Sequence, residues 1–184
     1  MGKRVCPWWL GYFLANPLRR LLRADPQLSN YVREGMTVLE PGPGMGYFTP
    51  ELARLVGAKG RIIAVDVQAR MLAGLRRRVA KAGLSERVDA RLAPADSMGL
   101  ADLAGRIDFT LAVAVVHEFP SAERFFAEVS QASKPGATVL LVEPAGHVQP
   151  NEFETELQAA ARAGLAVVER PAIRRSHRAL LRKG

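Results

Sequence analysis

Cysteine is almost absent from this sequence, which has one such residue, Cys6, among 184. A single cysteine cannot form an internal disulfide and has no cysteine partner for a zinc site, so we expect a reducing compartment, the cytoplasm. Repeats and low-complexity tracts are also missing, and 48% of the residues are hydrophobic. These features are typical of a globular protein of one ordinary domain, and they argue against a disordered or solenoid protein.

Long apolar runs are missing as well. The run from Val5 to Ala15 is too short to span a bilayer, and Pro17 and three arginines follow it closely. It also lacks the small-residue cleavage pattern of a secretion signal. We therefore expect no transmembrane segment and no signal peptide. Weak contact with a membrane surface stays open, because apolar residues beside arginines suit anionic lipid.

Lysine is scarce relative to arginine: the net charge of +8 is built from 21 Arg and 5 Lys. The arginines are scattered along the chain and concentrate in three places, at residues 19–23, 76–81 and 170–183. Each place is a candidate phosphate-binding patch. Solvated faces in an Arg-rich composition are the simpler interpretation. A nucleic-acid partner is therefore an alternative that we do not favour.

Short β-branched runs alternate with amphipathic stretches along the chain, which is typical of a parallel sheet covered by helices. We expect strands at 37–40, 61–66, 88–92, 107–113 and 138–143, and a closing pair at 166–170 and 177–181. Helices are expected at 49–56, 69–82, 123–132 and 151–163, with Gly83 and Gly164 as helix stops. The sequence predicts an α/β fold whose strands are buried on both faces.

The segment before the first strand has its own pattern. Leucine and aromatic residues between Leu10 and Leu22 keep helical spacing despite Pro17. We expect residues 1–30 to form a helical cap of the same domain as residues 31–184, packed across the carboxyl edge of the sheet. Its aromatic side chains either fill the core or line a substrate pocket.

A glycine-rich turn follows the first expected strand, in the run Val38-Leu-Glu-Pro-Gly-Pro-Gly-Met-Gly46. Glycines suit a place where a ligand approaches the backbone closely, because no Cβ is in the way. A dinucleotide-binding turn needs its third glycine three residues after the second, and that position is Tyr47. The acid-x-Gly-x-Gly-x-Gly spacing instead resembles the first motif of the class I S-adenosylmethionine-dependent methyltransferase family.

Three later motifs agree with this resemblance. The run Ile62-Ile-Ala-Val-Asp66 is an apolar strand that ends in a carboxylate, and Asp96-Ser97 follows the third strand. The run Val115-Val-His117-Glu118 follows the fourth strand and also resembles the family. Lys134-Pro-Gly136 is expected to form a turn before the fifth strand, as in small-molecule branches such as quinone-biosynthesis methyltransferases. The resemblance implies one Rossmann-like domain with a seven-stranded, mostly parallel sheet, an antiparallel closing strand, and helices on both faces.

The resemblance also implies S-adenosyl-L-methionine as the cofactor and assigns residues to it. Asp66 would accept hydrogen bonds from both ribose hydroxyls, unless it only caps a helix. Asp96 and Ser97 would hold the adenine amino group, unless they only form a local turn. Pro41 and Pro43 depart from the common motif and each remove one amide. The expected cofactor-binding residues are Glu40, Gly42, Gly44, Gly46, Tyr47, Asp66, Val67, Asp96, Ser97 and Ala112, with Phe48 beside them.

Catalysis in such a fold is a direct displacement on the methyl group, for which no metal is required. His117 is the candidate general base, because the end of the fourth strand faces the substrate side in this family. Glu118 would orient His117 or bind a cationic substrate. Glu143 and His147 follow the fifth strand, at the same edge. A core or capping role is the alternative for each of these side chains.

The methyl acceptor is narrowed by motifs that the sequence lacks. Val-His-Glu-Phe stands where methyltransferases of base amines carry Asn or Asp, Pro, Pro and an aromatic residue. There is no Pro-Cys nucleophile, and one cysteine does not supply the thiols that arsenite methylation needs. A small-molecule acceptor therefore leads. An RNA or protein methyltransferase that uses basic patches is the alternative, and a non-catalytic cofactor-binding or membrane-surface protein is the third hypothesis.

Overall fold

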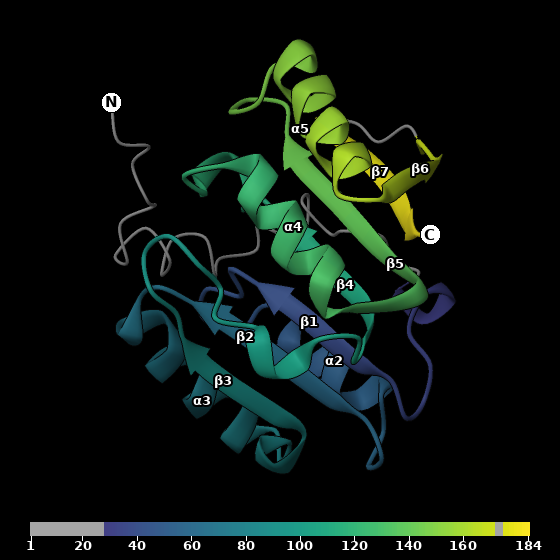
Figure 1. The fold of residues 1–184 in the computed structure, drawn as a ribbon. Coiled ribbons are helices and arrows are strands. Elements are labelled where there is room, and N and C mark those ends of the chain that lie inside the picture. Colours follow the sequence, from purple (N-terminus) through teal and green to yellow (C-terminus); the bar gives the residue numbers. More distant parts are fainter. Residues whose placement is uncertain (1–27, 172–174) are drawn as a thin grey trace. The chain divides into compact units, whose positions relative to one another are not determined.

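The fold is known from a computed structural model that describes residues 28–171 and 175–184 (Figure 1). The described chain forms two compact units. We call residues 28–95 the N-terminal unit and residues 96–184 the C-terminal unit. The predicted helix between Leu10 and Leu22 lies outside the described residues. Of the expected cap, only the short 3-10 helix at Leu28–Asn30 is described.

Seven strands form one sheet with the order β3-β2-β1-β4-β5-β7-β6. β7 runs antiparallel to both β5 and β6. This confirms the predicted seven-stranded, mostly parallel sheet with an antiparallel closing strand. The strands are β1 (Thr37–Pro41), β2 (Arg61–Asp66), β3 (Val88–Leu92), β4 (Ile107–Val113), β5 (Ser133–Pro144), β6 (Leu165–Glu169) and β7 (Ser176–Lys183).

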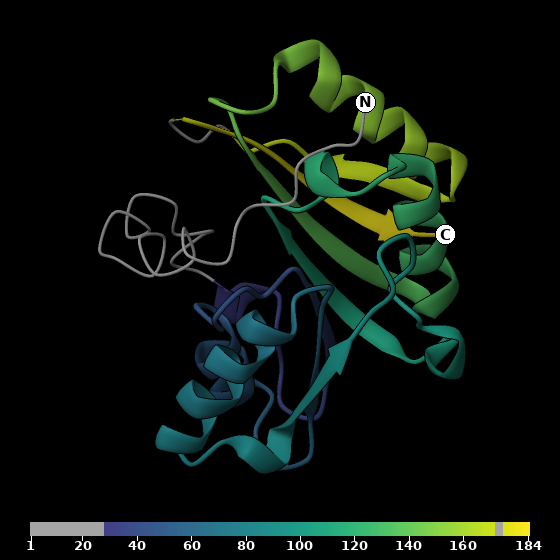
Figure 2. The same ribbon diagram turned by 90° about the vertical axis from the view of Figure 1, so that its left-hand side faces the viewer.

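The N-terminal unit contains β1, β2 and β3, which pair in parallel. The helices α2 (Thr49–Leu55) and α3 (Ala69–Lys81) contact each other and the strands, so both cover one face of this part of the sheet (Figures 1 and 2). Leu72, Leu75 and Val79 of α3 are buried in this layer. Burial of this apolar stripe is the main force that holds the helix on the strands.

α3 ends where the sequence predicts. Gly83 has a φ of +68°, a conformation that favours glycine, and its N–H donates to Ala80 O at 3.0 Å. The next amide, Leu84 N–H, donates to Val79 O at 2.9 Å. This pair of hydrogen bonds is the Schellman arrangement that closes a helix. It sends the chain back toward β3.

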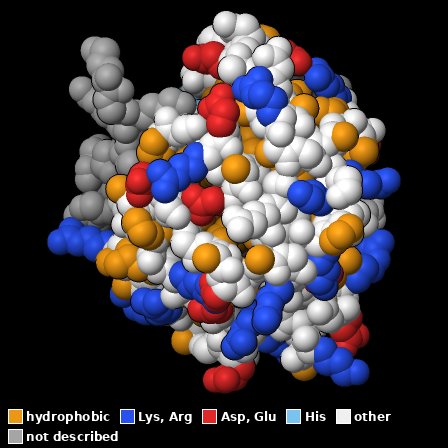
Figure 3. Space-filling view, viewed as in Figure 1, with side chains coloured by type: hydrophobic (Ala, Val, Ile, Leu, Met, Phe, Trp, Pro, Cys, Tyr) orange, Lys and Arg blue, Asp and Glu red, His pale blue; other side chains and the backbone are white. Residues whose placement is uncertain are grey.

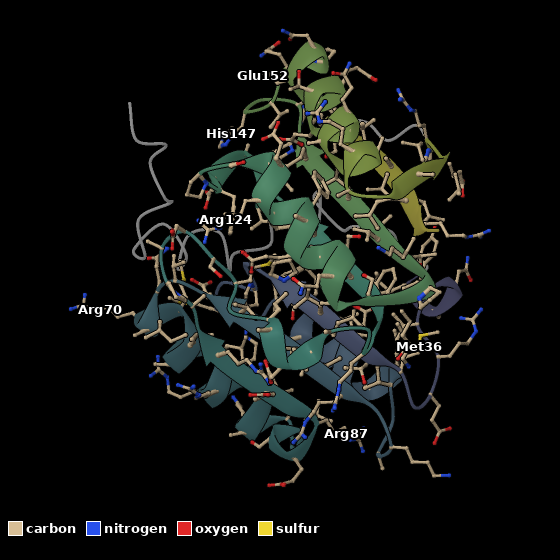
Figure 4. All side chains as sticks on the ribbon, viewed as in Figure 1. Met36, Arg70, Arg87, Arg124, His147 and Glu152 are labelled. Atoms are coloured by element: carbon tan, nitrogen blue, oxygen red, sulfur yellow. The ribbon has the colours of Figure 1, made fainter. Side chains whose placement is uncertain are left out.

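The C-terminal unit contains the parallel pair β4 and β5 and the closing strands β7 and β6. The helices α4 (Ala122–Ala132) and α5 (Pro150–Arg162) contact each other and lie on the same side of these strands (Figures 1 and 2). Phe125 and Phe126 of α4 are fully buried. Glu152 closes the start of α5, where its Oε2 accepts a hydrogen bond from Gln149 N–H at 2.7 Å (Figure 4).

Lys134-Pro-Gly136 was predicted to form a turn before the fifth strand, and this prediction is wrong because the segment belongs to β5. β5 already begins at Ser133, which is opposite Ile107, while Thr138 is opposite Phe109. Three more residues of β5 than of β4 therefore lie between these pairs, so the segment bulges within the strand. Gly136, at a φ of +76°, allows the chain to bend there.

Burial on both faces holds for the inner strands and fails at the ends of the sheet. The residues of β1 after Thr37 and those of β2 after Arg61 are buried. In β3 most residues are half-buried and Leu92 is 60% exposed, while Val168 of β6 is 45% exposed. β3 and β6 are edge strands, which neighbouring elements cover less completely. No helix among residues 28–171 and 175–184 is long and apolar enough to cross a membrane.

Candidate functional site

The glycine-rich turn leaves β1 with every second residue in the left-handed region. φ is +61° at Gly42, +55° at Gly44 and +75° at Gly46. Two of the glycine amides hold the turn together: Gly42 N–H donates to Val65 O at 2.9 Å, and Gly46 N–H donates to Pro43 O at 3.0 Å. These two glycines therefore shape the turn through their own backbone bonds.

The side of the turn at Gly44 is open, while the side at Gly46 is packed. Among the described residues, a Cβ added at Gly44 would meet nothing within 4 Å. A Cβ at Gly46 would stand 3.0 Å from Leu75 Cγ and 3.3 Å from Thr49 Oγ1. Gly46 is thus required by the contact with α3, whereas no described residue fills the space at Gly44, which suits a ligand that approaches the backbone.

This difference predicts unequal effects on stability. Both Gly44→Ala and Gly46→Ala place a Cβ in the left-handed region, which costs about 1–2 kcal/mol. Gly46→Ala also overpacks Leu75, which adds about 1–3 kcal/mol. We expect urea unfolding to show a clearly larger loss for Gly46→Ala than for Gly44→Ala. Equal losses would contradict the packing role of Gly46.

Glu40 anchors the beginning of the turn. Its side chain is buried, with the residue 2% exposed, and its Oε2 accepts a hydrogen bond from Thr49 Oγ1 at 2.7 Å. Thr49 is the first residue of α2, so this bond ties the end of β1 to the helix that follows the turn. The sequence indicated Glu40 but not its partner. Tyr47 is half-buried and packs edge-to-face on the buried Phe48, with ring centroids 4.9 Å apart.

Asp66 ends β2, and the residue is 8% exposed. Its Oδ1 accepts a hydrogen bond from the backbone N–H of Gln68 at 2.8 Å, past the half-buried Val67. Gln68, and not Asp66, is the N-cap residue of α3. The bond fixes the orientation of the Asp66 carboxylate at the carboxyl end of the strand.

In the C-terminal unit, His117 follows β4 on a short 3-10 helix at Val116–Glu118. The chain reaches it through Ala114, whose φ of +52° is unusual for a residue with a Cβ. His117 Nδ1 lies 2.5 Å from Oε2 of Glu143, which ends the apolar part of β5 and is fully buried. The other oxygen, Oε1, accepts Val116 N–H at 2.9 Å and Val115 N–H at 3.3 Å.

The carboxylate bonded to His117 is thus Glu143, whereas the sequence suggested Glu118 for that role. Glu118 is half-buried and acts on His117 through its charge. The sequence placed Glu143 at the same edge, but its contact with His117 joins two residues that are 26 positions apart in the chain. The only local signal is a carboxylate at the end of the otherwise apolar run Val-Leu-Leu-Val.

Burial of the His117 ring works against its charged form, but nearby carboxylates outweigh it. The hydrogen bond to Glu143 and the charges of Glu143, Glu118 and Glu156 raise the pKa of His117 above its ordinary value of 6.5. His147 is exposed and packs edge-to-face on this ring, with centroids 5.8 Å apart. His117 therefore sits in a site that favours holding a proton.

The raised pKa of His117 predicts how stability depends on pH. The folded state binds this proton more tightly than the unfolded state, whose histidine has a pKa near 6.5. The contribution is complete below pH 6.5 and is lost as the pH rises through the folded pKa. We expect the Tm of the wild type to fall over this range relative to that of His117→Gln. Parallel curves for the two proteins would contradict the pKa direction.

Asp96 and Ser97 make contacts within their own unit. Asp96 is exposed and pairs with Arg124 at the start of α4, with Nη1 and Oδ2 3.0 Å apart. Ser97 Oγ donates to Glu128 Oε2 at 3.2 Å and accepts Gly99 N–H at 3.0 Å. The contact of Ser97 with Gly99, two residues on, is of the kind that the local-turn alternative predicts. A role with adenine stays a prediction, as does that of Ala112, which is buried on β4.

Basic side chains on one face of the protein lie among side chains of other kinds (Figure 3). Figure 3 shows Lys and Arg side chains mixed with acidic and hydrophobic ones on the face in view. Arg162 and Arg170 form ion pairs with Glu123 and Glu154. On α3, Arg70 extends away from the helix (Figure 4). This mixture supports the simpler interpretation of the charge, as solvated faces.

The family is shown by a comparison of sequences. Residues 39–141, more than half of the chain, match the family described as "Methyltransferase domain". The match includes the glycine-rich turn, Asp66, Asp96, Ser97 and His117. This chain belongs to the class I S-adenosylmethionine-dependent methyltransferases, as the order of its motifs predicted.

The curated relatives are longer proteins. An arsenite methyltransferase of Halobacterium salinarum is 28% identical over 134 residues, which are 73% of this chain and 33% of the relative. The ubiquinone/menaquinone biosynthesis C-methyltransferase UbiE of Klebsiella pneumoniae is 29% identical over 112 residues, 61% of this chain and 44% of the relative. This chain therefore matches less than half the length of either.

A solved structure aligns with nearly the whole chain. It is a SAM-dependent methyltransferase from Aquifex aeolicus, with a TM-score of 0.85 and 24% sequence identity. The alignment includes 98% of this chain and 100% of the other. At this identity the likeness establishes the fold, and it confirms the Rossmann-like methyltransferase fold predicted from the sequence.

Proposed function

We propose that this protein transfers the methyl group of S-adenosylmethionine to a small-molecule acceptor. The observation that carries the proposal is the glycine-rich turn with an open side at Gly44, together with the fixed carboxylate of Asp66 in the same unit. Both features suit a ligand with a polar chain and a ribose. They come from the unit that also carries the first family motif.

The residues present fit the cofactor. Gly44 leaves space beside the backbone, and Glu40 with Thr49 keeps the turn in place. Asp66 would bind the ribose hydroxyls, since an ionised carboxylate accepts two hydrogen bonds from a diol. When bound, S-adenosylmethionine supplies a methyl group on a positively charged sulfur. Tyr47 and Val67, which are half-buried next to these residues in sequence, complete the predicted contacts.

The acceptor side of the proposal rests on the C-terminal unit. His117 would accept a proton from the acceptor, because its Nδ1 is occupied by Glu143 and its other ring nitrogen is the remaining basic atom. His117 would thus act on the acceptor, a role separate from those predicted for the cofactor-binding residues.

A small molecule is favoured over a macromolecule by two observations. On the face shown in Figure 3 the basic side chains are mixed with acidic ones, whereas a nucleic-acid surface needs clustered positive charge. Both curated relatives carry names of enzymes that methylate small molecules. Arsenite itself is disfavoured as the acceptor, because the single cysteine does not provide the thiols for it.

The proposal is tested by following a radiolabelled methyl group from S-adenosylmethionine. The protein is incubated with pools of phenols, quinols, amines and thiols, and in parallel with ribosomal RNA, transfer RNA and a protein extract. We expect label in a low-molecular-weight product and none in the macromolecules. Label only in RNA or protein would overturn the small-molecule assignment. Asp66→Ala serves as the inactive control.

A further inference from the structure

Glu143 is a buried carboxylate to which no role in a reaction has been given. Its residue is 0% exposed, and both of its oxygens contact polar groups that follow β4. Burying a carboxylate is costly unless it is hydrogen-bonded. An apolar residue would fill the end of β5 without that cost, so the presence of a carboxylate there calls for an explanation.

The contacts of Glu143 divide into two groups. Oε1 accepts the backbone N–H groups of Val115 and Val116, which fixes the carboxylate to the segment after β4. Oε2 faces His117 Nδ1 at 2.5 Å. An ionised carboxylate only accepts hydrogen bonds, so the hydrogen of this contact is on Nδ1. In the neutral ring, the lone pair is then on Nε2.

We propose that Glu143 is a positioning residue that holds His117 in the Nδ1–H tautomer, and that this pair acts on methyl acceptors which must lose a proton. This inference rests on the proposed function, in which His117 Nε2 accepts a proton from the methyl acceptor. It narrows the acceptors to hydroxyls, enols, thiols and N–H or C–H acids. Tertiary amines and thioethers, which have no such proton, are excluded.

The step balances without any further reactant. A lone pair or electron pair of the acceptor atom forms the bond to the methyl carbon, and the carbon–sulfur bond breaks with its electron pair left on sulfur. The proton of the acceptor goes to His117 Nε2, giving an imidazolium whose Nδ1–H is still bonded to Glu143. The charge of the carboxylate stabilises this imidazolium.

The groups that act on the His117 ring come from several elements. They are Glu143 of β5, Glu118 of the 3-10 helix, Glu156 of α5, and the ring of His147 in the loop after β5. Glu143 is hydrogen-bonded to the ring, whereas Glu118 and Glu156 act on its pKa through their charge. Substituting Glu118 and Glu143 separately therefore distinguishes the effect of charge from that of orientation.

Glu143→Gln provides the sharpest test because it changes one atom and reverses the hydrogen bond. The oxygen of the new amide can keep the contact with Val116 N–H, so its NH₂ group faces His117 Nδ1. Nδ1 must then accept, and the proton moves to Nε2. We expect Nδ1–H in the wild type and in Glu118→Gln, and Nε2–H in Glu143→Gln.

The measurement is the ¹⁵N chemical shift of both His117 ring nitrogens in histidine-labelled protein, at a pH above the titration of the ring. His117→Gln assigns the signals. An Nε2–H ring in the wild type would overturn the proposal, and this result needs no variant to fold. An Nδ1–H ring in a folded Glu143→Gln variant would also overturn the proposal. A move of the proton from Nδ1 to Nε2 in Glu118→Gln would overturn it too.

Acceptor chemistry is tested in the labelled-methyl assay with catechol, thiophenol and N,N-dimethylaniline as probes. Methylation of a protic probe that falls at least tenfold in Glu143→Gln supports the proposal, and methylation of dimethylaniline alone contradicts it. Calorimetric binding of S-adenosylmethionine is measured on the same proteins. If the wild type does not bind S-adenosylmethionine, the proposed function is refuted. If it binds S-adenosylmethionine but His117 carries its proton on Nε2, only the inference drawn from Glu143 is refuted.

Discussion

Asp66→Asn should weaken the binding of S-adenosylmethionine about a hundredfold and leave the fold intact. The Asn oxygen can still accept the Gln68 N–H, so the bond that orients the end of β2 survives. The second position becomes an NH₂ group, which cannot accept a hydrogen bond from a ribose hydroxyl. Losing such charge-assisted bonds costs about 3 kcal/mol, which is about a hundredfold in affinity.

The matched control for this prediction is Asp89→Asn. Asp89 is an acidic residue of the same unit, on β3, where it pairs with Arg91 at 2.9 Å. Both substitutions remove one negative charge, so a general electrostatic effect would appear in both. Calorimetry should show wild-type affinity for Asp89→Asn. Wild-type affinity in Asp66→Asn would mean that Asp66 serves only the start of α3.

His117→Ala should lower kcat about 100- to 10,000-fold toward a protic acceptor, the range expected for a positioned general base. The affinity for S-adenosylmethionine should change little, because His117 is not among the predicted cofactor-binding residues. A defect in kcat with normal cofactor binding separates a role in proton transfer from a role in folding.

The pH profile gives a second reading of the same residue. His117 acts as a base only when it is neutral, and its pKa is raised above 6.5 by Glu143 and the neighbouring carboxylates against the effect of burial. The wild-type rate should therefore rise with pH through the folded pKa and then level off. This rise should be missing in His117→Ala. A rate in the variant that keeps the same rise would place the titrating group elsewhere.

Most of the fold was predictable because most elements carry a clear local signal. β2, β3 and β4 begin and end at the predicted residues, since each is a short run bounded by turn residues. Gly83 marks the end of α3 in sequence and in structure. The bulge in β5 was not predictable, because Pro135 and Gly136 favour a turn locally and only pairing with β4 keeps the segment in the strand.

The candidate site was predictable in its residue types and less so in its contacts. The glycine-rich turn is continuous in sequence, so its position and the need for glycine follow from the motif. The partners of His117 and Ser97 come from distant segments, Glu143 and Glu128. Such pairs depend on how strands and helices meet, and a neighbouring acid such as Glu118 is easily taken for the partner.

The central claim is that the glycine-rich turn and Asp66 bind S-adenosylmethionine. Calorimetric titration of the purified protein with S-adenosylmethionine, and with S-adenosylhomocysteine as the product, tests it without knowledge of the acceptor. The account predicts one site per chain with micromolar affinity for both compounds. Absence of binding by either compound to a folded protein would contradict it.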